Sequence, residues 1–333
     1  MNKKFKLFTH TDLDGIGCAI LAYMAFGESG FHCENVDVEY CDYKNVNDKV
    51  EALIEDEELF KSYDAVYITD ISVTDDVANM IDILDAGTRK VKLFDHHATA
   101  LGLNKYEWCE VRVGEAVKTS GTELFFVHLL NSGYLDKCRE HYMENLDRFV
   151  EIVRDYDTWR WKEVLCEKEG LVCKQVNDLF HIYGRDKFVN WSLGRIRDRL
   201  GREYPNFDAM DKFLLEQKQT DIDIYVAQKN KQLTVVEDNF GYKCGVVFAE
   251  RYFSELGNRL SELHPELDYI AMIDIGFGGV SYRTIKDDID LGGEIAHSFG
   301  GGGHRKAAGS TFDSGAICNV VINDIFGLES DIL

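Results

Sequence analysis

The sequence predicts an α/β protein in which a doubly wound parallel-sheet domain is followed by a smaller α/β domain. Three observations support this fold class. Short strand-like segments alternate with helical ones near the N-terminus, a long uninterrupted helical stretch follows, and a second set of strands and helices comes after it. A chain of 333 residues is also long enough for about two hydrophobic cores.

The first hundred residues contain the alternating pattern. Strands are expected at residues 5–9, 36–40, 65–69 and 91–94, and helices at 15–26, 46–54 and 75–84. Strands that alternate with helices form a parallel sheet covered on both faces. Ligands of such sheets bind beyond the carboxyl ends of the strands, so the residues that follow each strand become the candidates for a site.

The second region starts after a connector. Residues 206–240 contain neither Gly nor Pro, and a long helix is expected around 213–233. Strands at 246–249, 269–274 and 280–285 follow, with an amphipathic helix at 252–263. We therefore place the first domain at 1–200, with a helical insertion at 160–200, the helical connector at 201–239 and the smaller domain at 240–333.

Composition restricts the function. A net charge of −22 opposes tight binding of long nucleic acids, because each phosphate contact needs a Lys or Arg. The nine cysteines contain no C-x-x-C pair, so we expect free thiols. Neither a signal-peptide core nor an apolar run long enough for a membrane span is evident, so a cytoplasmic location with no membrane partner is expected.

Acidic and imidazole side chains follow three of the predicted strands. In chain order they are Asp12, Asp14, Asp70, Asp95, His96 and His97. One aspartate in such a position is usually a helix cap or a turn residue, but this set converges on one edge of the sheet. Carboxylates with imidazoles suit Mn²⁺ or a similar ion, and two such ions about 3.5–4 Å apart promote phosphoryl displacement.

These segments resemble the motifs of DHH phosphoesterases. The matching stretches are His10-Thr11-Asp12-Leu13-Asp14-Gly15, Thr69-Asp70 and the triplet Asp95-His96-His97 that names the family. The resemblance implies that Asp12 and Asp14 each bind one metal ion, that Asp70 bridges both ions and that His96 is a further ligand. It also implies that His97 contacts the substrate phosphate or its leaving group, while Asp95 orients the imidazoles.

Two ligand positions stay open. Many family members have a histidine four residues before the first motif aspartate, where this chain has Phe8. His10 is two residues before Asp12, and side chains two apart face the same side of a strand, so His10 is either a ligand or a neighbour of one. A further acidic ligand is expected from residues 153–159, where Asp157 is preferred and Asp155 is the alternative.

Residues 120–123, Ser-Gly-Thr-Glu, also have counterparts in the family. The spacing of Ser120 and Glu123 before an apolar run matches a helix capping box. We therefore expect a structural role for this segment.

A glycine-rich stretch at 300–303 precedes three basic residues. Glycine N–H groups can approach an anion closely, and basic side chains add donors; small residues at 307–309 are expected to begin a helix. The stretch resembles the GGGH motif of DHHA1 domains, together with residues 280–283 and 293–296. The resemblance implies a substrate site for the phosphate or terminal nucleotide. Its residues are Arg283, Gly301, Gly302, Gly303, His304 and Arg305.

The resemblance covers most of residues 1–165 and 240–312 and is greatest to nanoRNase B-type oligoribonucleases. It implies hydrolysis of di- to pentanucleotide RNA to mononucleotides with two metal ions, Mn²⁺ being expected and Mg²⁺ or Co²⁺ the alternatives. The partners are then short RNA or dinucleotides, not long nucleic acid, and a homodimer stays open. Alternative functions are a linear or cyclic dinucleotide phosphodiesterase, a 3′-phosphoadenosine-5′-phosphate phosphatase, a RecJ-like exonuclease and an inactive nucleotide-binding scaffold.

Overall fold

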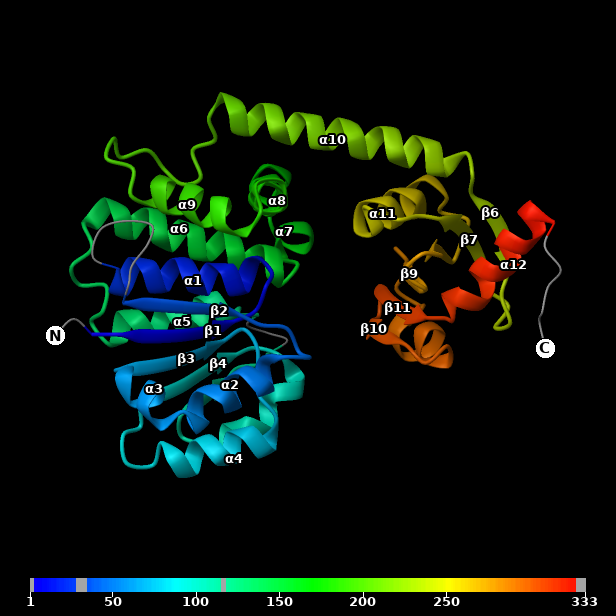
Figure 1. Ribbon diagram of the computed structural model, residues 1–333. Helices are drawn as coiled ribbons and strands as arrows, with labels where there is room; N and C mark the ends of the chain where they lie inside the picture. Colours follow the sequence, from blue (N-terminus) through cyan, green and yellow to red (C-terminus); the bar gives the residue numbers. More distant parts are fainter. Residues whose placement is uncertain (1–2, 28–34, 115–117, 328–333) are drawn as a thin grey trace. The chain divides into compact units, whose positions relative to one another are not determined.

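The computed structural model describes residues 3–27, 35–114 and 118–327. It divides into two compact units, Met1–Leu215 and Glu216–Leu333, and helix α10 (Ala209–Asn230) spans the boundary between them (Figure 1). The division into two domains and a separate connector stays a prediction. In the described residues no helix is long and apolar enough to cross a membrane. The eight cysteines that the structure describes are free thiols, and Cys33 lies outside the described residues.

A five-stranded parallel sheet forms the centre of the first unit. Its strand order is β2-β1-β3-β4-β5, and every neighbouring pair is parallel. The strands are β1 (Phe5–Thr9), β2 (Val36–Tyr40), β3 (Ala65–Thr69), β4 (Val91–Asp95) and β5 (Cys109–Val111). The doubly wound parallel sheet expected from the sequence is confirmed.

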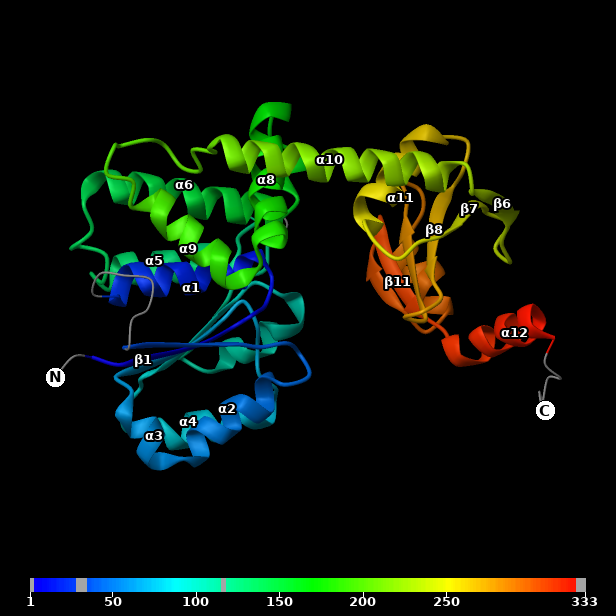
Figure 2. The ribbon, with the colours of Figure 1, turned by 45° about the horizontal axis from the view of Figure 1, so that its top comes forward.

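Helices cover both faces of this sheet (Figures 1 and 2). One face packs against α1 (Leu13–Phe26) and α5 (Gly121–Asn131). Helices α6 (Glu140–Asp157), α8 (Glu167–Tyr183) and α9 (Arg185–Ile196) form a second layer outside these two, with the short α7 (Arg160–Glu163) beside α8. The other face packs against α2 (Val46–Glu55), α3 (Glu57–Ser62), α4 (Asp75–Leu84) and the 3₁₀ helix η1 (Ala98–Lys105). Because both faces are covered, β1 is buried along its whole length.

The second unit contains a six-stranded mixed sheet of order β10-β11-β9-β8-β7-β6. Its strands are β6 (Thr234–Glu237), β7 (Lys243–Phe248), β8 (Tyr269–Asp274), β9 (Gly279–Arg283), β10 (Gly302–His304) and β11 (Ala307–Thr311). Helix α11 (Phe253–Leu263) packs on one face and the π-helix η2 (Leu291–Ala296) on the other. Helix α12 (Ser314–Phe326) follows β11.

The prediction that a helix begins at residues 307–309 is wrong. These residues belong to β11, which pairs with β10 on one side and β9 on the other. Ladder hydrogen bonds to two neighbouring strands satisfy the backbone here, and this tertiary pairing outweighs the helix propensity of the alanines.

Candidate active site

The ends of β1, β3 and β4 lie side by side and bring their following residues together. The register pairs Thr9 with Thr69, and Thr69 with Phe94. The Thr9 hydroxyl donates to the carbonyl of Gly15 at 2.9 Å, which ties the start of α1 to the sheet. Gly15 has no room for a side chain, since a Cβ there would lie 2.2 Å from the His10 carbonyl oxygen. The tight turn between β1 and α1 therefore requires glycine.

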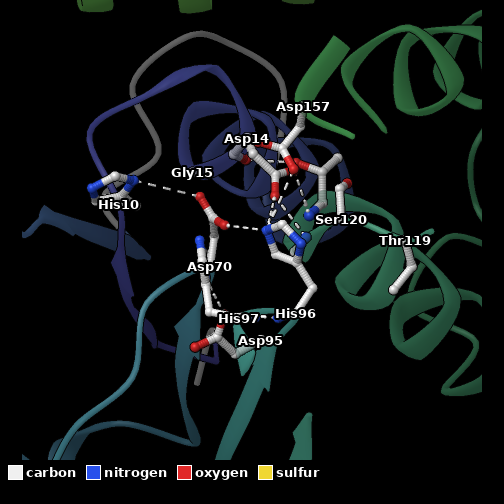
Figure 3. A network of polar contacts seen from close by, with 12 residues as sticks. His10, Asp14, Gly15, Asp70, Asp95, His96, His97, Thr119, Ser120 and Asp157 are labelled. Atoms are coloured by element: carbon white, nitrogen blue, oxygen red, sulfur yellow. Dashed lines mark hydrogen bonds and ion pairs between the residues drawn. The ribbon is translucent and has the colours of Figure 1, made fainter. Parts of the chain in front are cut away.

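A first group of ligand atoms surrounds His96 (Figure 3). Its Nε2 lies 3.6 Å from Asp14 Oδ2, 3.3 Å from Asp70 Oδ1 and 3.4 Å from Asp157 Oδ2. These four side chains come from the starts or ends of α1, β3, β4 and α6. The sequence interpretation expected the same four side chains to meet.

A second group lies on the other side of Asp70. His10 Nδ1 is 2.9 Å from Asp12 Oδ2 and 3.8 Å from Asp70 Oδ2. Asp70 thus presents Oδ2 to this group and Oδ1 to His96. Asp12 also caps α1 by accepting the Gly15 N–H at 3.1 Å. The close contact with Asp12 raises the pKa of His10, whereas burial opposes that rise.

The backbone of Asp70 is held in an uncommon conformation. Its φ is 57°, in the left-handed region that non-glycine residues rarely adopt. Its N–H donates to the carbonyl of Phe94 at 2.9 Å, and Gly121 packs so closely that a Cβ there would lie 2.6 Å from Asp70 Cβ. Strain of this kind persists where the surroundings fix it, and it is frequent at functional sites.

Asp14 is fixed by the start of α5. Its carboxylate accepts the backbone N–H of Gly121 at 2.6 Å and of Thr122 at 2.9 Å. The first N–H groups of a helix have no partner within the helix and favour an anion. The sequence interpretation missed this role. Its only signal was the position of Gly121 and Thr122 directly after a capping serine.

The expected capping box at the same place is half formed. Ser120 Oγ accepts the N–H of Glu123 at 3.2 Å, as a helix cap does. The Glu123 carboxylate instead accepts from Thr119 Oγ1 at 2.6 Å and from Arg154 at 2.8 Å. The segment therefore both caps α5 and positions Asp14 through the N–H groups of Gly121 and Thr122.

Asp95 organises the two histidines. Its Oδ1 lies 2.7 Å from His97 Nδ1 and accepts the backbone N–H of His96 at 2.7 Å, while its Oδ2 accepts from the Ser72 hydroxyl. The hydrogen bond with Asp95 raises the pKa of His97. Burial acts to raise the pKa of Asp95, but the hydrogen bond and charge of His97 more than offset it and lower that pKa. Asp95 thus lies where an orienting residue is expected.

Of the two candidates on α6, the structure brings Asp157 to the cluster and not Asp155. Asp157 is the last residue of α6 and approaches His96. Asp155 is buried in ion pairs, with its Oδ1 2.9 Å from the Nε atoms of both Arg154 and Arg160. The alternative that placed Asp155 at the metal therefore has no geometric support.

The residues fit divalent cations. Asp70 Oδ2 and His96 Nε2 are buried and have no hydrogen-bond partner. Burial, and next the charges of Asp14 and Asp12, raise the pKa of Asp70 well above its usual value, and burial lowers the pKa of His96. A neutral imidazole beside crowded carboxylates is a donor set that a hard or borderline cation stabilises. Three ligand groups in the described residues are compact enough to hold an ion.

One aromatic residue at this site was missed. The ring of Tyr43, in the loop after β2, lies 5.4 Å from the His10 ring and 6.2 Å from the His97 ring, and 56% of the residue is exposed. Burial and the nearby carboxylates raise its pKa to about 12. No pattern in the sequence marks it, because its partners come from distant strands.

In the second unit, two predicted substrate residues share a face of the sheet. His304 on β10 pairs with Ala307 on β11, which pairs with Arg283 on β9. Directly opposed residues project to the same side. The Arg283 Nε is buried without a hydrogen-bond partner, while its other nitrogens donate to Ser254 Oγ and the Tyr282 carbonyl.

The other predicted substrate residues differ in their surroundings. A Cβ at Gly303 would lie 2.7 Å from Ala308 Cα, and the φ of Gly303 is +139°, so glycine is required there. Arg305 donates twice to the carbonyl of Asp287, at 3.0 and 2.9 Å. Its substrate role stays a prediction.

Comparison with known proteins bears on the identity of the chain. No family model matches it. The chain is 37% identical to oligoribonuclease NrnB of Bacillus subtilis strain 168 over 309 residues, which cover 92% of this chain and 72% of that protein.

Solved structures share the fold at low sequence identity. The DHH domain of a member of a ribosomal protein family matches with a TM-score of 0.63 and 14% identity, covering 99% of this chain and 88% of that one. RecJ of Thermus thermophilus in complex with Mn²⁺ matches at 0.54 and 12%, covering 100% and 53%. The pGpG-specific phosphodiesterase PggH of Vibrio cholerae matches at 0.51 and 14%, covering 98% and 100%.

The chain shares the fold of solved DHH-domain proteins. The match to oligoribonuclease NrnB over most of both sequences goes further. The chain belongs to the oligoribonuclease NrnB family.

Proposed function

We propose that this protein is an oligoribonuclease that hydrolyses very short RNA to nucleoside monophosphates with two divalent metal ions. The observation that carries the proposal is the orientation of Asp70, whose two carboxylate oxygens face two different groups of ligand atoms. A bridging carboxylate in a two-metal site has this arrangement. Family membership supports the choice of reaction.

Each ion would be held by one group in addition to Asp70. One group is His10 and Asp12; the other is Asp14, His96 and Asp157. When bound, such ions lower the pKa of a water molecule and neutralise phosphoryl charge. The oxygen and imidazole donors favour Mn²⁺, with Mg²⁺ or Co²⁺ as alternatives, and RecJ structures contain Mn²⁺ or Mg²⁺.

The chain's own side chains position the reacting groups. In hydrolysis the water oxygen bonds to phosphorus and gives up one proton, while the bond from phosphorus to the departing ribose oxygen breaks and that oxygen takes up one proton. His97 engages Asp95 through Nδ1, which leaves Nε2 for the phosphate or the leaving oxygen. The hydrogen bond to Asp95 favours the protonated imidazole, a donor suited to either task.

Charge and anchoring favour short substrates. With a net charge of −22, the protein repels the remaining phosphates of an extended strand. We assign His304, Arg283 and the glycines of β10 to the capture of one substrate end, because the two basic side chains share one face of the sheet and the glycines beside them leave the backbone of the edge strand open. Affinity would then come from few phosphates, held locally.

The test is a panel of substrates with Mn²⁺, in which initial rates are measured by chromatography. The panel contains a diribonucleotide, a pentaribonucleotide, an RNA of about 24 nucleotides, cyclic dinucleotides and 3′-phosphoadenosine-5′-phosphate. We expect the rate per enzyme to fall at least about tenfold from the dinucleotide to the longest RNA, and the slower rate to be more salt-sensitive. Equal or faster digestion of the longest RNA would refute the proposal in favour of a RecJ-like exonuclease. A preference for cyclic dinucleotides or 3′-phosphoadenosine-5′-phosphate would refute it in favour of those activities.

A further inference from the structure

The sheet of the second unit has an open strip without large side chains. Gly302 on β10 pairs with Gly309 on β11, which pairs with Ser281 on β9. The three residues face the same side as His304 and Arg283, because residues two apart on a strand share a face. A Cβ at Gly302 would meet nothing within 4 Å. The strip is therefore a flat floor bounded by backbone and one hydroxyl.

Helix α11 lies on the same face but covers a different part of it. A Cβ at Gly257 of α11 would lie 2.5 Å from Arg283 Cγ and 2.7 Å from Met272 Cε, so α11 packs over β8 and the edge of β9. Beyond α11, the Ser281 and Gly309 part of the floor lines a cleft of about 570 Å³, and Gly302 lies next to it as the strand partner of Gly309. The lining of the cleft includes Phe253, Asp274, Phe277, Ser281, Gly309 and Thr311.

Phe277 stands at the edge of this cleft on a hydrogen-bonded turn. The residue is 81% exposed. Its N–H donates to Asp274 Oδ1 at 2.9 Å, and the next N–H, of Gly278, donates to the Asp274 carbonyl at 2.9 Å. A Cβ at Gly279 would lie 3.1 Å from the Phe277 ring, so the ring stands over the glycine end of β9. A single exposed phenylalanine is ordinary, but this one is fixed beside a glycine floor.

We propose that this cleft binds one nucleobase of the RNA substrate, flat on the glycine floor and in contact with Phe277. The proposal rests on the function proposed above for the identity of the ligand. A base has two apolar faces and a polar edge. The floor and the phenyl rings of Phe277 and Phe253 suit the faces, while the hydroxyls of Ser281 and Thr311 suit the edge.

The spacing along the strands agrees with one nucleotide. The row formed by His304, Ala307 and Arg283 lies two residues from the row of Gly302, Gly309 and Ser281. Two residues of a strand span about 7 Å, which is the order of the distance between the base and the phosphate of one nucleotide. The basic row would then hold the phosphate while the floor holds the base.

The test compares Phe277→Ala with Phe326→Ala. Phe326 is 72% exposed, lies on α12 of the same unit and is not part of the cleft. The substrates are a diribonucleotide and two analogues that each lack one base. We expect Phe277→Ala to lower kcat/KM on the intact dinucleotide about tenfold, and to have no effect beyond the control on one of the two analogues.

A binding measurement separates this proposal from the proposed function. The dissociation constant of AMP is measured by calorimetry on each metal-free protein, and Phe277→Ala should raise it about tenfold relative to Phe326→Ala. If the two variants behave alike on all three substrates and toward AMP, the base site is refuted even where the wild type cleaves RNA. If the wild type cleaves no RNA but Phe277→Ala still weakens AMP binding, the base site stands and the proposed function fails.

Discussion

Replacement of Asp70 by asparagine should change stability and activity in opposite directions. Asp70 is 1% exposed, and burial and the charges of Asp14 and Asp12 raise its pKa well above its usual value. At neutral pH this raised pKa lowers the free energy of unfolding, because the carboxyl ionises freely only in the unfolded state. Each pKa unit of the shift lowers it by about 1.4 kcal/mol. An asparagine side chain has a similar shape and no charge. We expect Asp70→Asn to raise the free energy of unfolding of the metal-free protein by at least about 1 kcal/mol.

In the presence of Mn²⁺ the wild type should become more stable than Asp70→Asn. An ion at a hundred times its dissociation constant stabilises the wild type by about 2.7 kcal/mol per site, and the variant, which lacks a bridging carboxylate, should gain much less. Its rate on a diribonucleotide should fall at least about a hundredfold. Urea unfolding with and without Mn²⁺ and initial rates measure these quantities. Asp85→Asn is the control, because Asp85 is equally buried but accepts from the Val91 N–H outside the cluster.

The control should lose stability with or without Mn²⁺ and keep the rate. Two results would contradict the reasoning. One is a metal-free Asp70→Asn protein less stable than the wild type, which would mean that the carboxylate is already compensated by the protein. The other is a rate above about a tenth of the wild-type value, since a bridging role does not allow it.

Other substitutions test the rest of the cluster and one histidine outside it. Asp157→Ala should abolish dinucleotide hydrolysis without loss of stability. Asp155→Ala should lower the rate less, but it should lower the free energy of unfolding in urea by about 2 kcal/mol because its ion pairs are lost. The reverse order of rates would exchange the roles of the two aspartates. Gly121→Ala should reduce the rate more than about tenfold, because its methyl group displaces Asp70, and an unchanged rate would refute the packing argument. Burial lowers the pKa of His128 from 6.5 to about 4. As the pH falls from 6.5 to 4, the free energy of unfolding of the wild type should therefore fall by up to about 3 kcal/mol relative to that of His128→Leu. The same pH dependence of stability in both proteins would argue against this reasoning.

The first sheet could be predicted because its local and tertiary signals agree. Residues 5–9, 36–40 and 65–69 were expected as strands, and the structure has β1, β2 and β3 at these positions. β1 and β3, covered on both faces, are short and largely apolar, whereas the edge strand β2 alternates apolar and polar residues, and both patterns have clear ends. The acidic residues come directly after those ends, so their convergence followed from the topology alone.

The contacts that fix the cluster could not be predicted in the same way. The hydrogen bond from the Gly121 N–H to Asp14 joins residues 107 positions apart, and the ring of Tyr43 contacts that of His97 from another loop. Periodicity and capping rules concern neighbours in sequence, so they do not encode which helix start faces which carboxylate. Residues 307–309 were assigned to a helix for a related reason: β11 exists only because β9 and β10 lie on either side.

The carboxylates of the cluster differ in how their charge is compensated. Asp14 receives two backbone N–H groups; burial opposes ionisation of Asp12, but the hydrogen bond and charge of His10 outweigh it and lower the pKa of Asp12 to about 2. Burial and the charge of Asp14 raise the pKa of Asp157, as they do for Asp70. The protein's own groups thus compensate the negative charge of Asp12 and Asp14, whereas a bound cation would compensate that of Asp70 and Asp157. Loss of Asp14 should therefore damage the fold as well as metal binding, whereas loss of Asp70 or Asp157 should weaken metal binding without destabilising the metal-free fold.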